Sequence, residues 1–203
     1  MAAPVTFTRL SMPRLALRSI PLTALMIAGF GTAAFAHPGH GGGLMAGLAH
    51  PFTGLDHMLA MVAVGLWAAQ LGRPAMWTLP VVFPAMMALG AGLGTNGVVA
   101  PWIEIGIVFS AVVLGAAVAF GIKAPLAIGA VLVGAFAVLH GYVHGAELPA
   151  ESSAWLYGLG FVAATLVLHG IGIGLGTCTQ RSLIQRAAGG AIAAAGLLLF
   201  IVH

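Results

Sequence analysis

The sequence predicts an all-α protein: a polytopic membrane helix bundle with six transmembrane helices after a cleavable signal peptide. Hydrophobic residues make up 61% of the 203-residue chain and charged residues only 5%, whereas a soluble domain carries about a quarter charged residues. Six apolar segments also occur along the chain, each close to the ~20 residues that an α-helix needs to cross a bilayer. The connections between them are short, so we expect no soluble domain between the helices.

Residues 1–36 have the features of a secretory signal peptide. Three arginines precede an apolar core, which ends at the small-x-small sequence Ala34-Phe35-Ala36. This order of basic, apolar and small residues is typical of a cleavable signal. We therefore expect the mature chain to begin at His37. The alternative is a leader that is retained as an additional helix.

Residues 37–53 are predicted to form an outer His/Gly-rich N-terminal segment, and residues 54–203 the six-helix transmembrane domain. The segment begins His37-Pro-Gly-His40-Gly-Gly-Gly, and its two histidines are candidate metal ligands, with a solvated linker as the alternative. The six predicted membrane segments cover approximately residues 54–72, 75–94, 98–120, 124–145, 153–176 and 187–202.

The distribution of basic residues predicts the orientation. If the mature N-terminus lies outside, every basic residue of the mature chain falls in an inner connection: Arg73, Lys123, Arg181 and Arg186. Positive residues concentrate on the cytoplasmic side of membrane proteins. Both mature termini are therefore predicted to be periplasmic, in a multi-pass protein of the bacterial inner membrane.

Composition also excludes several classes of function. The net charge of +3 comes from scattered single residues, so there is no basic patch for nucleic acid. A single cysteine, Cys178, excludes an internal disulfide and a cysteine-based metal site within one chain. The sequence has no Walker-type phosphate-binding motif and hence no built-in ATPase.

The stretch from His50 to His57, H-P-F-T-G-L-D-H, places two imidazoles and the Asp56 carboxylate at the start of an apolar segment. Ionisable groups within a membrane are costly and usually functional. Imidazole and carboxylate without thiolate suit borderline divalent metals such as nickel, cobalt or zinc. Alternatively, Thr53 and Asp56 form a capping box at the start of a helix.

A second polar pattern ends the fourth segment. His140, His144 and Glu147 are spaced i, i+4 and i+7, which places them on one face of a helix. His-x-x-x-His on a helix can bind one metal ion with both rings. The alternative is a pair of hydrogen-bonded packing histidines with Glu147 solvated in the outer loop.

The predicted topology brings both patterns to the same outer depth. Glu104, near the start of the third segment, enters from the same side, so it either faces this site or extends to the interface. His169 lies deeper in the fifth segment. It is either a further ligand on a path inward or a core histidine bonded to a backbone carbonyl.

These motifs, H-P-x-x-G-x-D-H at residues 50–57 and H-G-x-x-H-G-x-E at residues 140–147, resemble those of the HupE/UreJ family of membrane proteins. The resemblance covers essentially the whole mature chain. It implies uptake of nickel or cobalt across the inner membrane for hydrogenase or urease maturation, with no tightly bound cofactor. By motif position, His50, Asp56 and His57 would be the principal functional residues, supported by His140, His144 and Glu147.

The resemblance predicts a transporter and not an enzyme, with a divalent metal ion and the lipid bilayer as partners; a homo-oligomer is left open. A zinc-dependent intramembrane hydrolase is the alternative, since three histidines and a carboxylate can bind zinc and leave a position for water. Haem ligation by a histidine pair across helices is a third hypothesis. Transport differs from both in requiring polar groups toward the opposite side, and His169 fits that requirement.

Overall fold

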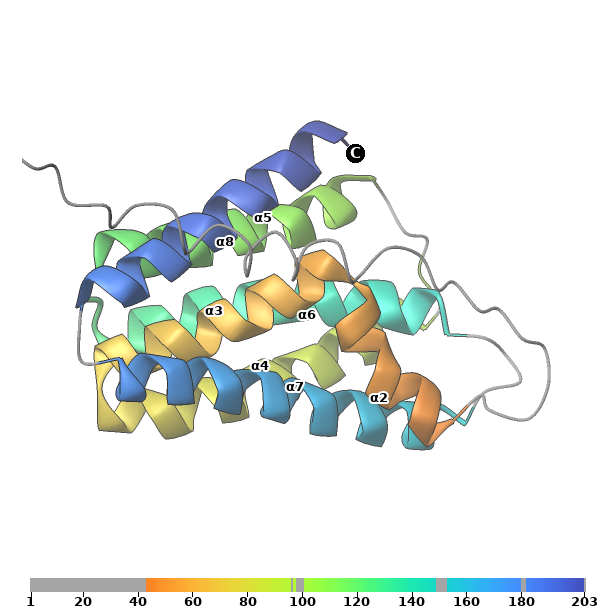
Figure 1. Cartoon of the computed structure of the whole chain (residues 1–203). Coiled ribbons are helices and arrows are strands. Elements are labelled where there is room, and N and C mark those ends of the chain that lie inside the picture. Colours follow the sequence, from red (N-terminus) through yellow and green to blue (C-terminus); the bar gives the residue numbers. More distant parts are fainter. Residues whose placement is uncertain (1–42, 96, 98–100, 149–152, 180–181, 203) are drawn as a thin grey trace, which may run out of the picture. The chain divides into compact units, whose positions relative to one another are not determined.

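A computed structural model describes residues 43–95, 97, 101–148, 153–179 and 182–202. The predicted leader, its cleavage site, His37 and His40 lie outside these residues. Within them the secondary structure is entirely α-helical, so the all-α prediction is confirmed. The helices are α2 (Leu44–Thr53), α3 (Leu55–Leu71), α4 (Arg73–Gly94), α5 (Pro101–Phe120), α6 (Leu126–Ala146), α7 (Ala154–Cys178) and α8 (Ser182–Val202) (Figure 1).

The helices confirm a multi-pass membrane bundle. From α4 to α8, five helices are long and apolar enough to cross a membrane, and the bent pair α2–α3 makes a sixth span if it is counted as one. α3 corresponds to the first predicted segment. α2 was expected to belong to the outer N-terminal segment, but it is a helix that meets α3 at an angle of 84°.

The last helix is longer than expected. The sequence predicted a short segment from residue 187, whereas α8 begins at Ser182 and has 21 residues. Gln185 and Arg186, which precede the predicted start, bond to backbone carbonyls of neighbouring segments. The Gln185 amide donates to Gly176 and Thr179, and Arg186 Nε donates to the carbonyl of Ala119 at 2.8 Å. These bonds allow both polar residues to lie in the first turns of α8.

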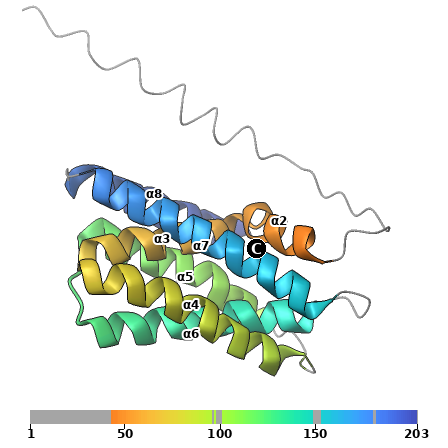
Figure 2. The ribbon, with the colours of Figure 1, turned by 90° about the horizontal axis from the view of Figure 1, so that it is seen from below.

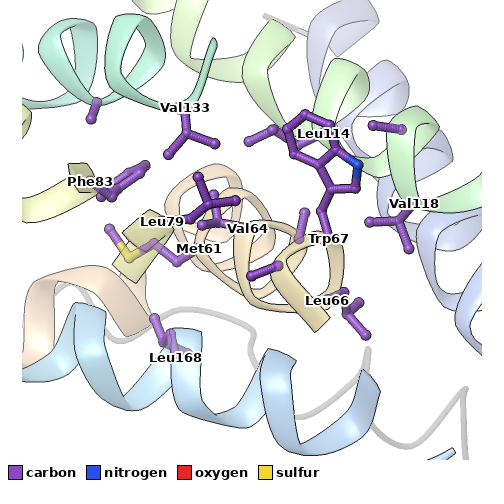
Figure 3. Packing of buried hydrophobic residues seen from close by; sticks show 14 of the residues in the cluster. Met61, Val64, Leu66, Trp67, Leu79, Phe83, Leu114, Val118, Val133 and Leu168 are labelled. Carbon is purple, nitrogen blue, oxygen red and sulfur yellow. The ribbon is translucent and has the colours of Figure 1, made fainter. Parts of the chain in front are cut away.

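α3 is the central helix of the bundle, since it contacts every other described helix (Figure 2). Trp67 and Met61 on this helix are almost fully buried. Figure 3 shows these side chains among Leu79 and Phe83 of α4 and Leu168 of α7. A helix that is buried all round must be apolar on all faces, so each polar group that α3 carries needs a partner.

Small residues bring the helices close together. A Cβ atom added at Gly141 of α6 would lie 1.9 Å from the carbonyl oxygen of Met87 in α4, and one at Gly65 of α3 would lie 2.3 Å from that of His169 in α7. Such contacts are possible only without a side chain, and van der Waals packing of this kind holds membrane helices together. The helix pairs α4–α6 and α3–α7 are therefore closely packed.

Basic residues gather at the end of the bundle where α3 ends and α4 begins. Arg73 begins α4, Lys123 Nζ donates to the carbonyl of Gln70, and Arg186 bonds to α5. We call this the basic end. The start of α3, with His57, lies at the other end of the same helix.

Candidate metal centre

A break in the backbone positions the first histidine motif. Gly54 separates α2 from α3; its N–H donates to the carbonyl of His50 at 3.3 Å and its own carbonyl accepts from Met58 N–H at 3.0 Å. A Cβ atom at Gly54 would lie 2.9 Å from His57 Nδ1. The absence of a side chain at this position therefore leaves room for the His57 ring to lie close to the break.

The capping-box alternative is not what the structure has. Gly54 is the N-cap of α3, and the Thr53 hydroxyl donates to the carbonyl of His50 at 2.8 Å. The Asp56 carboxylate accepts from His57 Nδ1 at 2.8 Å. Asp56 is thus bound to an imidazole, which is the arrangement expected of a carboxylate that supports a ligand.

Close packing of α2 on α7 fixes the position of His50. A Cβ atom at Gly47 would lie 2.0 Å from the carbonyl oxygen of Tyr157, and one at Gly160 would lie 2.1 Å from that of Leu44. The His50 ring consequently lies beside two aromatic rings of α7, with centroid distances of 6.0 Å to Tyr157 and 5.8 Å to Phe161. His50 is therefore held against the bundle although α2 bends away from α3.

Three histidines from three helices meet at this end of the bundle. His50 of α2, His57 of α3 and His144 of α6 each offer a ring nitrogen, and these three atoms lie within 4.8 Å of one another. His57 Nε2 and His144 Nε2 are 2.9 Å apart. We call this group the candidate metal centre. The two sequence motifs, 87 residues apart in the chain, therefore converge.

Hydrogen bonds orient the rings of His57 and His140. A carboxylate and a carbonyl only accept hydrogen bonds, so His57 Nδ1 donates to Asp56, and His140 Nδ1 donates to the carbonyl of Phe136 at 2.9 Å. In each neutral ring Nε2 then carries a lone pair; that of His57 Nε2 faces His144 Nε2, from which it accepts a hydrogen bond when no ion is bound. Histidine ligands of metals characteristically donate their other N–H to a carboxylate or carbonyl in this way.

His140 lies next to the candidate metal centre and deeper in the bundle. Its ring centroid is 5.1 Å from that of His57, it is fully buried, and its Nε2 has no hydrogen-bond partner among the described residues. Two residues of the site are more accessible than His140: the His50 ring is half-buried and the Asp56 side chain is 25% exposed. The group therefore passes from partial exposure at Asp56 to complete burial at His140.

A cavity of about 420 Å³ adjoins the candidate metal centre between α4, α6 and α7. His144 and Tyr157 are among the residues that line it, and most of the wall is apolar. His144 therefore borders both the candidate metal centre and this cavity.

The predicted polar face of α6 ends at His144. α6 ends at Ala146, and Glu147 is the C-cap, exposed, with its N–H bonded to the carbonyl of Val143. The prediction that Glu147 shares a helix face with His140 and His144 required the helix to include residue 147. Glu147 is consequently not part of the group of three ring nitrogens.

Glu104 and His169 also lie apart from that group. Glu104 is partly exposed in the first turn of α5 and does not belong to the described group. His169 is 1% exposed on α7, and its ring lies 5.2 Å from that of Phe83. The structure therefore brings together the histidines of the two motifs and Asp56, whereas Glu104, Glu147 and His169 lie apart from the three ring nitrogens.

Sequence reasoning missed the aromatic residues around the histidines. The Phe161 ring lies 4.5 Å from that of His144, and the Phe83 ring lies 5.6 Å from that of His140. Aromatic side chains are common in apolar helices, so nothing in the sequence distinguished these two from the other phenylalanines. Gly54 was part of the recognised motif, but its spacing role depends on the bend, which the sequence did not indicate.

Comparisons with known proteins identify the family of the chain. The chain matches the family described as HupE / UreJ protein over residues 24–199. It is 48% identical to Protein HupE of Rhizobium leguminosarum bv. viciae over 172 residues, which cover 83% of this chain and 90% of that protein. No solved structure matches the chain. The chain therefore belongs to the HupE/UreJ family, whose members are membrane transporters and not enzymes.

Proposed function

We propose that this protein is a permease that imports nickel, with cobalt as a second substrate, across the inner membrane of a bacterium. The imported metal would supply the maturation of hydrogenase or urease. The observation that carries the proposal is the convergence of His50, His57 and His144, whose ring nitrogens lie within 4.8 Å of one another. Membership of a transporter family supports it and argues against the zinc hydrolase.

The distance between two of the ligand atoms supports binding of one ion. Two nitrogens at ~2.0–2.1 Å from a metal and at 90° to each other are about 2.8–3.0 Å apart, whereas a tetrahedral angle separates them by roughly 3.3 Å. His57 Nε2 and His144 Nε2 are 2.9 Å apart. The two nitrogens share a hydrogen bond at this distance, and they are close enough to bind one ion once that bond is replaced. Nickel(II) accepts nitrogen ligands in neighbouring positions.

The charge of the site also favours a divalent cation. Asp56 is the one carboxylate hydrogen-bonded to a ring of the candidate metal centre in the described residues. An ion that leaves water for a membrane-embedded site loses hydration, and a nearby negative charge offsets part of that cost. Three imidazoles supply soft-to-borderline nitrogen donors, and the described group contains no thiolate. This donor set suits nickel and cobalt.

The proposed direction is inward from the histidines to the basic end. Arg73, Lys123 and Arg186 occupy the basic end, which the positive-inside rule assigns to the cytoplasm. The candidate metal centre would then face the periplasm, as would both termini of the mature chain. An ion would bind first at the half-buried His50 and pass to the buried His140.

Uptake of radiolabelled nickel by cells that lack other nickel importers tests the proposal. Expression of the chain should raise the initial rate, and His144→Ala should abolish the increase while the protein still reaches the membrane. Ser110→Ala is the matched control. Ser110 is a fully buried polar residue on α5 whose hydroxyl bonds to its own helix, at the carbonyl of Ile107. Uptake that is no greater than in cells without the chain would contradict the proposal.

A further inference from the structure

Two polar side chains on α7 are buried deep in the bundle and have no hydrogen-bond partner within the part of the chain that the structure describes. His169 is 1% exposed and Thr165 is 0% exposed. Among the described residues, neither ring nitrogen of His169 nor the hydroxyl oxygen of Thr165 has a partner. The two residues are four positions apart and therefore lie on the same face of the helix. Buried polar groups are almost always paired, so an unpaired cluster requires an explanation.

The position of His169 is between the candidate metal centre and the basic end. Phe161, whose ring lies 4.5 Å from that of His144, precedes His169 by eight residues on α7. Eight residues of α-helix rise by about 12 Å. His169 is therefore roughly two helical turns further from the site end than the candidate metal centre.

The ring of Phe83 links His169 to His140. Its centroid is 5.6 Å from that of His140 and 5.2 Å from that of His169, and both pairs are edge-on. Phe83 itself is fully buried. The free Nε2 of His140 and the unpaired nitrogens of His169 thus lie on rings that contact the same phenylalanine.

A purely structural role does not account for His169. His140 shows how a histidine is accommodated in this bundle, with Nδ1 donating to a carbonyl one turn earlier. His169 makes no such bond in the described part of the chain. Leucine would fill similar space without two desolvated nitrogens, so packing alone disfavours a histidine here.

We propose that His169 and Thr165 form an inner site, which receives the metal ion from His140 on its way to the basic end. This inference rests on the proposed function. An imidazole nitrogen and a hydroxyl oxygen are suitable ligands for a borderline divalent ion, whose remaining positions would hold water. With only two protein ligands, the inner site binds weakly, and a site along a conduction path must release its ion. The Phe83 ring separates the two sites.

Cobalt spectroscopy of purified full-length protein tests whether the ion reaches position 169. In a Cys178→Ser background, which removes the exposed native thiol, His169→Cys should give thiolate-to-cobalt charge-transfer absorption when cobalt(II) is added. Leu168→Cys is the matched control, since Leu168 is the neighbouring residue and is also buried, at 2% exposure. No absorption from His169→Cys, or equal absorption from both variants, would overturn the inner site.

A second experiment separates transport from binding and stability. For His169→Leu we expect nickel binding to the purified protein to change by less than about twofold. The uptake rate at saturating nickel should fall by at least ~10-fold, because a step after binding is blocked. Thr165→Val should lower the rate less. His169→Met, which offers a thioether in similar space, should recover part of it.

Thermal unfolding completes the comparison. The melting temperature of His169→Leu should equal or exceed that of the wild type, because an apolar side chain replaces unpaired nitrogens. A lower melting temperature, or failure of both the Leu and Met variants to reach the membrane, would assign His169 a structural role and overturn the inner site. Unchanged uptake by His169→Leu would do the same. Wild-type protein that neither binds nor imports nickel would instead contradict the proposed function.

Discussion

Replacement of Asp56 by asparagine separates the charge of the candidate metal centre from its geometry. Asp56 accepts the N–H of His57 Nδ1 at 2.8 Å, and its side chain is 25% exposed. An asparagine oxygen can accept the same hydrogen bond, so the His57 ring should keep its orientation. The variant loses only the negative charge. This charge offsets that of the bound ion and makes the His57 imidazole a stronger metal ligand.

The expected magnitude follows from the position of Asp56 behind a ligand. Loss of such a partner costs 10–100-fold in metal affinity, which corresponds to ~1.4–2.7 kcal/mol. Because a quarter of the Asp56 side chain is exposed, water screens part of the charge. We therefore predict a loss of ~10–30-fold for Asp56→Asn. Asp56→Ala removes the hydrogen bond as well, and its loss should approach ~100-fold.

Equilibrium dialysis of the purified protein with radiolabelled nickel measures these affinities, and uptake by intact cells measures their consequence. Thr53→Ala is the control, because its hydroxyl bonds to the carbonyl of His50 at the same break but does not touch a ring of the site. The control should bind nickel as the wild type does. Wild-type affinity in Asp56→Asn would refute this reasoning, because it would show that the charge of Asp56 does not contribute to nickel binding.

Three further predictions follow from the same geometry. His57→Ala and His144→Ala should be strongly non-additive in nickel affinity, the double variant losing at most about tenfold more than either single variant; additive losses in dialysis would mean separate sites. Initial uptake should fall as the external medium is acidified, because protons compete with the metal for neutral imidazole; stimulation by mild acid at fixed membrane potential would contradict this. Gly141→Ala should lower the melting temperature in detergent by an amount equivalent to ~1–3 kcal/mol, since its Cβ would lie 1.9 Å from a carbonyl oxygen of α4. Gly158→Ala, where nothing lies within 4 Å, should not lower it.

Apolar length predicted the helices because the bilayer imposes it. Segments from α4 to α7 begin and end within a few residues of the predicted limits, since a membrane helix cannot be much shorter than the hydrocarbon layer. α2 was not predicted as a helix. It has only 10 residues, contains Pro51 and follows a glycine-rich stretch. Its helical structure depends on packing against α7, which the sequence pattern of α2 alone does not reveal.

The meeting of the two histidine motifs could be predicted, but their internal arrangement could not. Equal depth in the membrane followed from the alternation of helix direction, and the structure brings His57 and His144 into contact. The pairing of Asp56 with His57 was not foreseen, because adjacent residues on a regular helix do not face each other. That pair lies in the first turn of α3, directly after the bend, where a glycine leaves room for the ring.

The difference between a ligand histidine and a packing histidine lies in the second ring nitrogen, and spacing in the sequence does not reveal where that nitrogen is directed. His57 and His140 each use Nδ1 to bond an acceptor, so Nε2 faces His144 in one ring and has no partner among the described residues in the other. Neither nitrogen of His169 has a hydrogen-bond partner among the described residues, so none of these residues orients its ring by a hydrogen bond. Oriented ligands lose less conformational freedom when they bind an ion, and they bind it more tightly. An ion should therefore be held firmly where rings are fixed and weakly at His169, which is the order of affinities that allows it to leave the bundle at the basic end.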